Sequence, residues 1–178
     1  ISKVVNGFGL TTTVEFADPN DPEVYDKGEP VTYPLKKSTG SATLVKSITT
    51  SNGIGGTLSS EYFYTGLTNQ MTGAGSLGFE SIAIKKEISS NVYETNTTYY
   101  SMDYKNHTEG MPLRTVSTID DVVVSESENF YDTIVYGAND NIVSGKTSIF
   151  NGDDGGATDQ QRYFMYTKTN LSKQFDSK

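Results

Sequence analysis

The segment with the clearest metal-binding chemistry is the acidic, glycine-rich stretch Asn151-Gly152-Asp153-Asp154-Gly155-Gly156. Calcium takes about six to eight oxygen ligands, and carboxylate and amide oxygens on a flexible turn can supply several of them. Asn151, Asp153 and Asp154 are therefore candidate calcium ligands. The spacing lacks the EF-hand order and its distal Glu, so a solvated hairpin loop is the more common use of such a sequence.

Tyrosines are the second group of residues with binding chemistry. The chain has 12 Tyr. Four of them, Tyr62, Tyr64, Tyr99 and Tyr104, lie in segments typical of strands, where exposed rings could stack on sugar rings. Aromatic residues at alternating strand positions are also what sheets use for packing, and this structural use is the stronger expectation. A sugar-binding site predicts an aromatic patch that is contiguous and open to solvent.

Residues that could carry catalysis form no recognisable motif. The chain has no Cys, which excludes thiol catalysis and zinc–thiolate sites, and its single His, His107, lies in an expected turn. No Gly-x-Ser-x-Gly motif occurs, so an acyl-transfer triad has no support. Any two of the 22 acidic residues could meet as a glycosidase pair, but nothing singles out a pair. We therefore expect no enzymatic activity and no cofactor other than calcium.

The segments that carry the candidate binding residues are predicted to be mostly β-strands and the turns between them. From Leu10 to Phe16 apolar and polar residues alternate, and a period of two indicates a strand with one buried face. Ala17 to Pro30 carries three Asp-Pro or Glu-Pro breaks and is expected to have no regular structure. Further strands are expected at Ala42–Ser51, Thr57–Tyr64, Ser76–Ile88, Val92–Tyr104, Leu113–Ile119, Asp121–Ser125, Phe130–Tyr136, Ile142–Phe150 and Tyr163–Lys168.

Two turns of the same design precede two of these strands. Asn6-Gly7-Phe8-Gly9 and Asn52-Gly53-Ile54-Gly55 are offset by 52 − 6 = 46 residues, and Phe16 and Tyr62 follow them at matched spacing. Asn and Gly supply the positive φ angles that tight turns need. Helical periodicity is not sustained anywhere, so the sequence predicts an all-β fold of mostly antiparallel sheets with Gly and Asn turns.

The length, net charge and hydropathy of the chain limit the classes of function that it can have. At 178 residues one domain is the default. The net charge of −8 argues against nucleic acid, since phosphate binding needs clustered Lys and Arg. No apolar run approaches the ~20 residues of a membrane-spanning helix. The chain starts at Ile1 without Met, which suggests a fragment of a larger polypeptide or a processed product.

The stretch from Ser47 to Ile82, SITTSNGIGGTLSSEYFYTGLTNQMTGAGSLGFESI, resembles the middle region of the B component of bacterial Tc insecticidal toxins and related RHS (YD-repeat) proteins. The resemblance spans about residues 5–119. It departs from the family at the corner Gly73-Ala74-Gly75-Ser76, where an Arg is usual between the glycines. Other matching pieces are Asn6-Gly7-Phe8-Gly9, Thr11–Phe16, Asp18-Pro19, Val24–Gly28, Tyr33-Pro34-Leu35 and Gly110–Thr115.

The resemblance implies a β-shell built from RHS strands that encloses a toxic cargo. On this reading residues 1–178 form one β domain of a larger polypeptide, with 1–119 the family-like part and 120–178 a divergent continuation. The chain would be a non-catalytic segment of a secreted or extracellular bacterial toxin, cytosolic before export, and its partner would be the rest of the RHS/Tc-type polypeptide or toxin complex. The alternative is a β-sandwich module that binds carbohydrate or a cell surface, with or without calcium.

Overall fold

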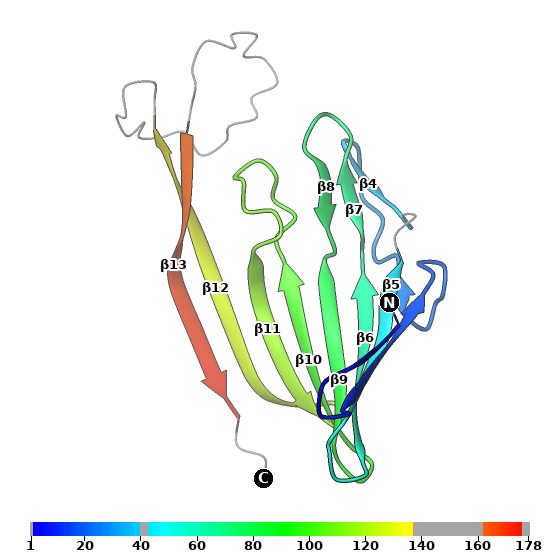
Figure 1. Ribbon diagram of the computed structural model, residues 1–178. Helices are drawn as coiled ribbons and strands as arrows, with labels where there is room; N and C mark the ends of the chain where they lie inside the picture. The colour runs from blue at the N-terminus through cyan, green and yellow to red at the C-terminus, as the bar shows by residue number, and fades with distance from the viewer. Residues whose placement is uncertain (1, 40–42, 137–161, 176–178) are drawn as a thin grey trace.

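The computed structural model describes residues 2–39, 43–136 and 162–175 (Figure 1). All regular structure in these residues is β: an open ten-stranded sheet and a three-stranded sheet, with no helix. Every strand pair is antiparallel except one. The expected all-β, mostly antiparallel fold class is therefore confirmed.

The large sheet has the order β1-β2-β5-β6-β9-β10-β11-β12-β13, with β3 beside β6, and the small sheet has the order β4-β7-β8. The small sheet contains β7 and β8, which form the connection between β6 and β9 of the large sheet (Figure 1). The strand bounds are β1 Lys3–Val5, β2 Thr11–Ala17, β3 Tyr25–Asp26, β4 Leu35–Lys37, β5 Leu44–Ser51, β6 Thr57–Thr65, β7 Thr68–Gln70, β8 Gly75–Gly78, β9 Ser81–Ser89, β10 Val92–Tyr100, β11 Pro112–Ile119, β12 Val122–Tyr136 and β13 Arg162–Gln174.

The two Asn-Gly turns have the same hydrogen bonds, as their sequences predict. The Asn6 side-chain oxygen accepts from the backbone N–H of Phe8 and Leu10, and the Asn52 oxygen accepts from those of Ile54 and Gly56. In each turn the Asn backbone N–H also donates to the carbonyl four residues on, at 3.0 Å and 2.9 Å. The equivalent glycines, Gly9 and Gly55, have φ of 79° and 91°. The repeat is therefore one turn design used twice.

Two expectations about individual elements before β10 were wrong. The loop from Ala17 to Pro30 contains β3, which pairs in parallel with Tyr64 and Thr65 of β6. The stretch Ser76–Ile88 is not one strand: β8 ends at Gly78, whose φ of 88° turns the chain, and β9 starts at Ser81 in the other sheet. In both places long-range pairing, which no local pattern encodes, decides the structure.

Strands after β9 also differ from expectation in their bounds. The strand expected at Val92–Tyr104 ends at Tyr100, and its register shifts lie near its two ends, at Val92/Tyr93 and Tyr99/Tyr100. Asp121–Ser125 and Phe130–Tyr136 belong to one strand, β12, because β11 and β13 pair with the polar stretch between them. β13 continues past Lys168 to Gln174. The strand expected at Ile142–Phe150 lies outside the described residues.

The described core is small and lies where β2, β3 and β5 meet. Ala17, Val24, Tyr25 and Leu44 are buried together. Tyr64, Leu67 and Phe79 pack against this cluster, and the Phe79 ring lies 6.3 Å from the Tyr25 ring and 5.0 Å from the Tyr64 ring, centroid to centroid. This cluster fixes the loop that carries Val24 and Tyr25 onto the large sheet.

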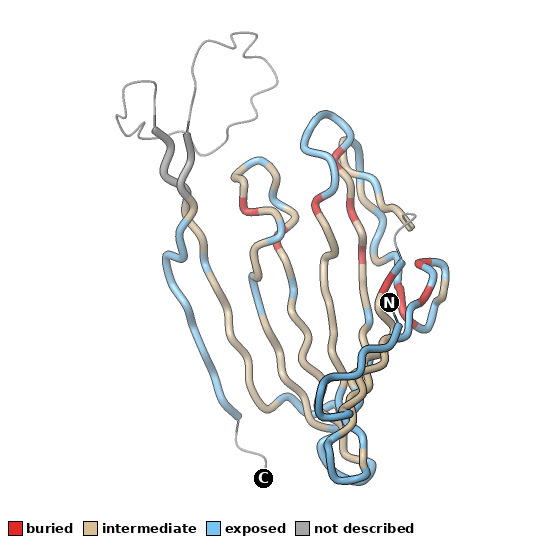
Figure 2. Tube along the Cα trace, viewed as in Figure 1, coloured by how far each residue is buried: buried red, intermediate tan, exposed pale blue. Residues whose placement is uncertain are grey.

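The rest of the large sheet is a single layer. No side chain from Ser81 to Tyr100 or from Met111 to Asp132 is buried, and Figure 2 shows the same intermediate exposure along these strands. Among the described strands, close backbone contacts run only between neighbours of the same sheet. The described residues therefore form an open sheet and not the two packed layers of a sandwich, so the sandwich form of the expected fold is not seen.

Candidate functional site

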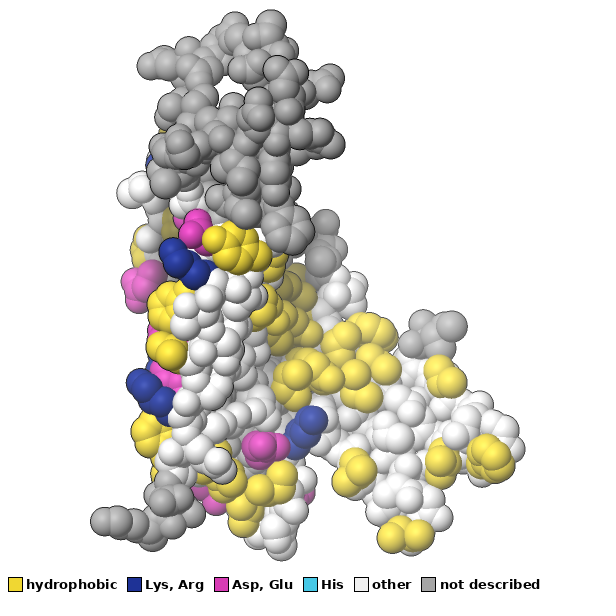
Figure 3. Space-filling view, turned by 90° about the vertical axis from the view of Figure 1, so that its left-hand side faces the viewer, with side chains coloured by type: hydrophobic (Ala, Val, Ile, Leu, Met, Phe, Trp, Pro, Cys, Tyr) yellow, Lys and Arg dark blue, Asp and Glu magenta, His cyan; other side chains and the backbone are white. Residues whose placement is uncertain are grey.

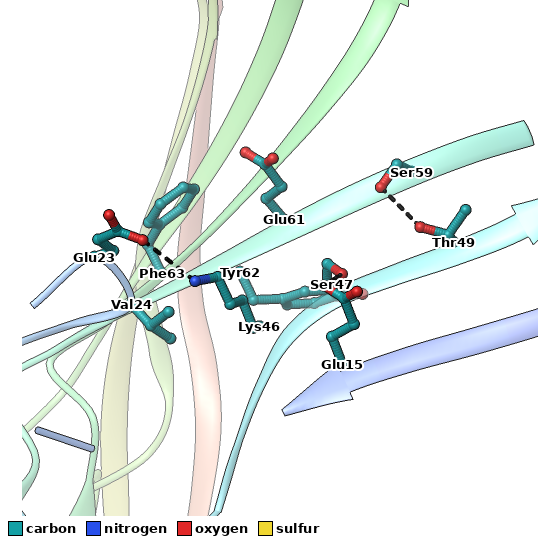
Figure 4. A pocket seen from close by; sticks show the side chains of 10 residues that line it. All are labelled: Glu15, Glu23, Val24, Lys46, Ser47, Thr49, Ser59, Glu61, Tyr62 and Phe63. Carbon is teal, nitrogen blue, oxygen red and sulfur yellow. Dashed lines mark hydrogen bonds and ion pairs between the residues drawn. The ribbon is translucent and has the colours of Figure 1, made fainter. Parts of the chain in front are cut away.

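A hollow of about 350 Å³ lies between β2, β5, β6 and the loop before β3 (Figure 4). Its lining combines carboxylates, hydroxyl groups, one ammonium group and aromatic rings. The lining residues are Glu15, Glu23, Val24, Lys46, Ser47, Thr49, Ser59, Glu61, Tyr62 and Phe63.

Strand register explains how the polar groups of this hollow come together. Glu15 pairs with Ser47, and Ser47 pairs with Glu61, so the three side chains form one row on one face of the sheet. The register of β2 and β5 shifts after Glu15, which leaves Lys46 as an extra residue on β5. A bulge re-aims side chains, and here it allows Lys46 to reach the loop before β3.

Lys46 ties that loop to the sheet. Its ammonium nitrogen lies 3.3 Å from a carboxylate oxygen of Glu23 and 3.5 Å from one of Asp21. The hydrogen bond that the Lys46 ammonium group donates to Glu23, and then the charge of Asp21, raise the pKa of the Lys46 amine above its ordinary value. These contacts favour the charged form of Lys46, which holds the loop by attraction to the two carboxylates.

The remaining polar groups of the hollow can bind hydroxylated ligands. Ser47 Oγ donates to Glu15 Oε2 at 3.0 Å, and the hydroxyl groups of Thr49 and Ser59 lie 3.1 Å apart. Among the described residues the Glu61 carboxylate makes no ion pair. Carboxylate acceptors, hydroxyl groups and the exposed Phe63 ring are the groups that bind the polar edges and the apolar face of a polyol.

The four tyrosines named as candidate ligand-binding residues do not form one surface. Tyr62 contributes to the lining of the hollow, whereas the Tyr64 hydroxyl donates to the Val45 carbonyl at 3.1 Å and its ring packs on Phe79. Tyr99, which is 41% exposed, pairs with Ser81 and Arg114, so it shares the face of Phe63 and is opposite to Tyr62 and Tyr64. Tyr104 lies in the loop after β10.

The calcium candidates Asn151, Asp153 and Asp154 lie outside the described residues. Within residues 2–39, 43–136 and 162–175 no group of three metal-ligating side chains occurs. His107 lies in the loop between β10 and β11, as expected from its neighbours, with a φ of 54°.

Sequence reasoning missed the most buried ion pair, between Lys37 of β4 and Glu80. The Lys37 side chain is only 7% exposed and Glu80 is 33% exposed. The Glu80 carboxylate lies against two glycines, Gly28 and Gly66, with φ of 69° and 70°. A Cβ at Gly66 would lie 2.2 Å from a Glu80 carboxylate oxygen. Glycine in Asp-Lys-Gly and Thr-Gly-Leu was the only local signal of this close approach.

Comparison with known proteins gave no match to a family model, a curated protein or a solved structure. Within the described part of the chain, no helix is long and apolar enough to span a membrane.

Proposed function

We propose that the chain is a non-catalytic structural segment of a bacterial Tc/RHS-type toxin shell that houses or delivers a toxic cargo. The observation that carries this proposal is the single-layer sheet. A sheet normally buries at least one face against another layer, yet strands β9, β10, β11 and the part of β12 up to Asp132 bury no side chain on either face. Such a sheet is suited to form the wall of a larger assembly, completed by further strands at its edges.

The sequence resemblance over residues 5–119 supports the same proposal. These residues contain β2 to β11, which include most of the open sheet and the whole small sheet. The partner would be the remainder of the RHS/Tc-type polypeptide or toxin complex. Its site of action would be extracellular, after synthesis in the bacterial cytosol and export.

The native mass of material purified from its source tests this proposal. Light scattering, with intact-mass identification of every co-eluting polypeptide, should give a mass far above the 19.4 kDa of this chain and continuous or tightly bound RHS-type sequence. The single-layer sheet would then be one part of a wall. A clean monomer of this chain would refute the proposal.

A second candidate function is binding of carbohydrate or a cell surface, and the hollow beside β5 favours it. Phe63, the carboxylates of Glu15 and Glu61 and several hydroxyl groups all line this hollow. Glycan-array binding of the parent chain and of Phe63→Ala tests this function. Loss of signal in the variant is expected if the hollow is the site, and an array without any hit would exclude the glycans displayed.

A further inference from the structure

The outer edge of β13, which is the side of this strand that faces away from β12, is a long strand edge without a neighbour. β13 spans 13 residues, and β12 is its only strand neighbour among the described residues. All its side chains from Tyr166 onward are exposed. Figure 3 faces this edge and shows a largely polar surface with separate basic and acidic side chains. A strand of this length with one open edge is a template for a further strand.

The register with β12 identifies the backbone groups that point outward. The Phe175 N–H donates to the Val124 carbonyl at 2.9 Å, so the backbone of Phe175 faces β12. Antiparallel pairs alternate between hydrogen-bonded and non-hydrogen-bonded, so Lys173 and Leu171, which oppose Glu126 and Glu128, also face β12. The N–H and C=O groups of the intervening residues, Asn170, Ser172 and Gln174, therefore point outward from the edge.

The charges of β12 and β13 are complementary. β13 contains Arg162, Lys168 and Lys173 and no acidic residue, in a chain whose net charge is −8. β12 contains Glu126, Glu128 and Asp132 and no basic residue. Lys168 binds Asp132 at 3.1 Å, and Arg114 of β11 binds Glu126 at 2.6 Å. Toward this edge of the sheet, a basic side chain on β11 is followed by an acidic strand, β12, and then by a basic strand, β13.

Lys173 is the basic side chain of β13 that could pair with a carboxylate on a further strand. It lies opposite Glu126, but Glu126 is bound by Arg114, and Lys173 makes no ion pair within the described part of the chain. With an incoming antiparallel strand, Lys173 would occupy a non-hydrogen-bonded pair, where the Cα atoms are about 4.5 Å apart and the side chains are closest.

We propose that the β13 edge binds an acidic antiparallel strand, with a carboxylate opposite Lys173 and an apolar side chain opposite Leu171. The strand would receive the outward hydrogen bonds of Asn170, Ser172 and Gln174. A second copy of β13 is the wrong occupant, because β13 contains no acidic residue that could lie opposite Lys173 in any register. The inference rests on the proposed function and deepens it by naming the chemistry of the adjoining strand.

Titration of the labelled 178-residue chain with two peptides tests this inference. The first probe is acetyl-Val-Thr-Glu-Thr-Val-Thr-Val-amide, whose Glu falls opposite Lys173 when its first Thr falls opposite Gln174. The matched control has Lys in place of Glu. We expect the Glu peptide to bind about 3- to 10-fold more tightly, since opposite charges across strands are favourable and like charges unfavourable.

Amide hydrogen exchange, read residue by residue by NMR, reports where the peptide binds. Before addition, the amides of Lys173 and Leu171 should exchange slowly and those of Asn170, Ser172 and Gln174 fast. The Glu peptide should slow the second group alone. Ser172→Pro removes one outward donor at an edge, where proline is tolerated, and should abolish binding, whereas Ser172→Thr should retain it.

A charge exchange keeps the test decisive if Ser172→Pro does not fold. Lys173→Glu should reverse the preference, so that the Lys peptide binds more tightly. Equal binding of both peptides, or no added protection at Asn170, Ser172 and Gln174, would overturn the inference. Protection that grows with protein concentration without peptide would also overturn it, in favour of a second copy. A large native mass combined with either result would leave the shell proposal standing and reject only this edge.

Discussion

Replacing Glu80 by Gln should destabilise the fold measurably, because this change leaves a nearly buried ammonium group without its counter-charge. Lys37 is 7% exposed and contacts the Glu80 carboxylate, which is 33% exposed. Removing one partner of a fully buried pair costs about 3–5 kcal/mol, and an exposed pair contributes about 0–1 kcal/mol. With one partner buried and the other partly hydrated, we expect Glu80→Gln to lower the free energy of unfolding by about 2 kcal/mol.

The ion pair between Lys37 and Glu80 lies at the junction between the two sheets, so the lost stability should come from this junction. Lys37 ends β4 of the small sheet, and Glu80 lies between β8 and β9, where the chain returns to the large sheet. The Glu80 backbone N–H donates to the Thr65 carbonyl, and its own carbonyl accepts from the Tyr100 N–H. The side chain can therefore be changed while the backbone connection remains.

Urea denaturation followed by circular dichroism measures this effect, and a thermal scan should show a lower Tm by about 4–8 °C for a chain of this length. Asp132→Asn is the matched control, since Asp132 and its partner Lys168 are 45% and 62% exposed and solvent screens their attraction, so this variant should lose much less stability. Lys37→Met combined with Glu80→Gln should recover part of the loss, because no buried charge then remains. A Glu80→Gln variant as stable as Asp132→Asn would refute the reasoning.

Three further outcomes can be checked in the same denaturation assay. Gly66→Ala should lower the free energy of unfolding by about 1–3 kcal/mol, since φ at Gly66 is 70° and the new Cβ would meet the Glu80 carboxylate. Gly7→Ala is the control and should leave this free energy nearly unchanged, because no atom lies within 4 Å of the new Cβ. Tyr25→Phe should lower the free energy of unfolding by about 1–3 kcal/mol, because the Tyr25 hydroxyl donates to the Ser38 carbonyl at 2.6 Å and accepts from the Leu67 N–H at 3.1 Å. An unchanged urea midpoint would contradict this prediction. Burial raises the pKa of the Tyr25 and Tyr64 hydroxyls above 10.0, so the unfolded state loses these protons first. The contribution of these two groups to stability is therefore fully present below about pH 10 and is lost as the pH rises further. A denaturation midpoint that does not change between about pH 10 and pH 11 would count against this reasoning.

The sequence predicted much of the strand pattern but little of the candidate site. The hairpin turns at Asn6 and Asn52 were predictable because Asn and Gly encode the turn within a few residues. The hollow was not, because Glu15, Ser47 and Glu61 meet only through the register of three strands. Tyr62 and Tyr99 were predicted together and lie on opposite faces, since the register of the intervening strands decides which face each ring occupies.

What the sequence determined by itself is local: the alternation that makes strands, the Asn and Gly turns that end them, and the absence of cysteine chemistry. Tertiary structure alone decided that β3 joins β6, that the chain changes sheets after Gly78, that Lys37 meets Glu80 and that β13 has an open edge. The physical reason is the range of the interactions. Side-chain alternation and turn dihedrals depend on adjacent residues, whereas sheet partners and ion pairs depend on residues brought together across long stretches of chain.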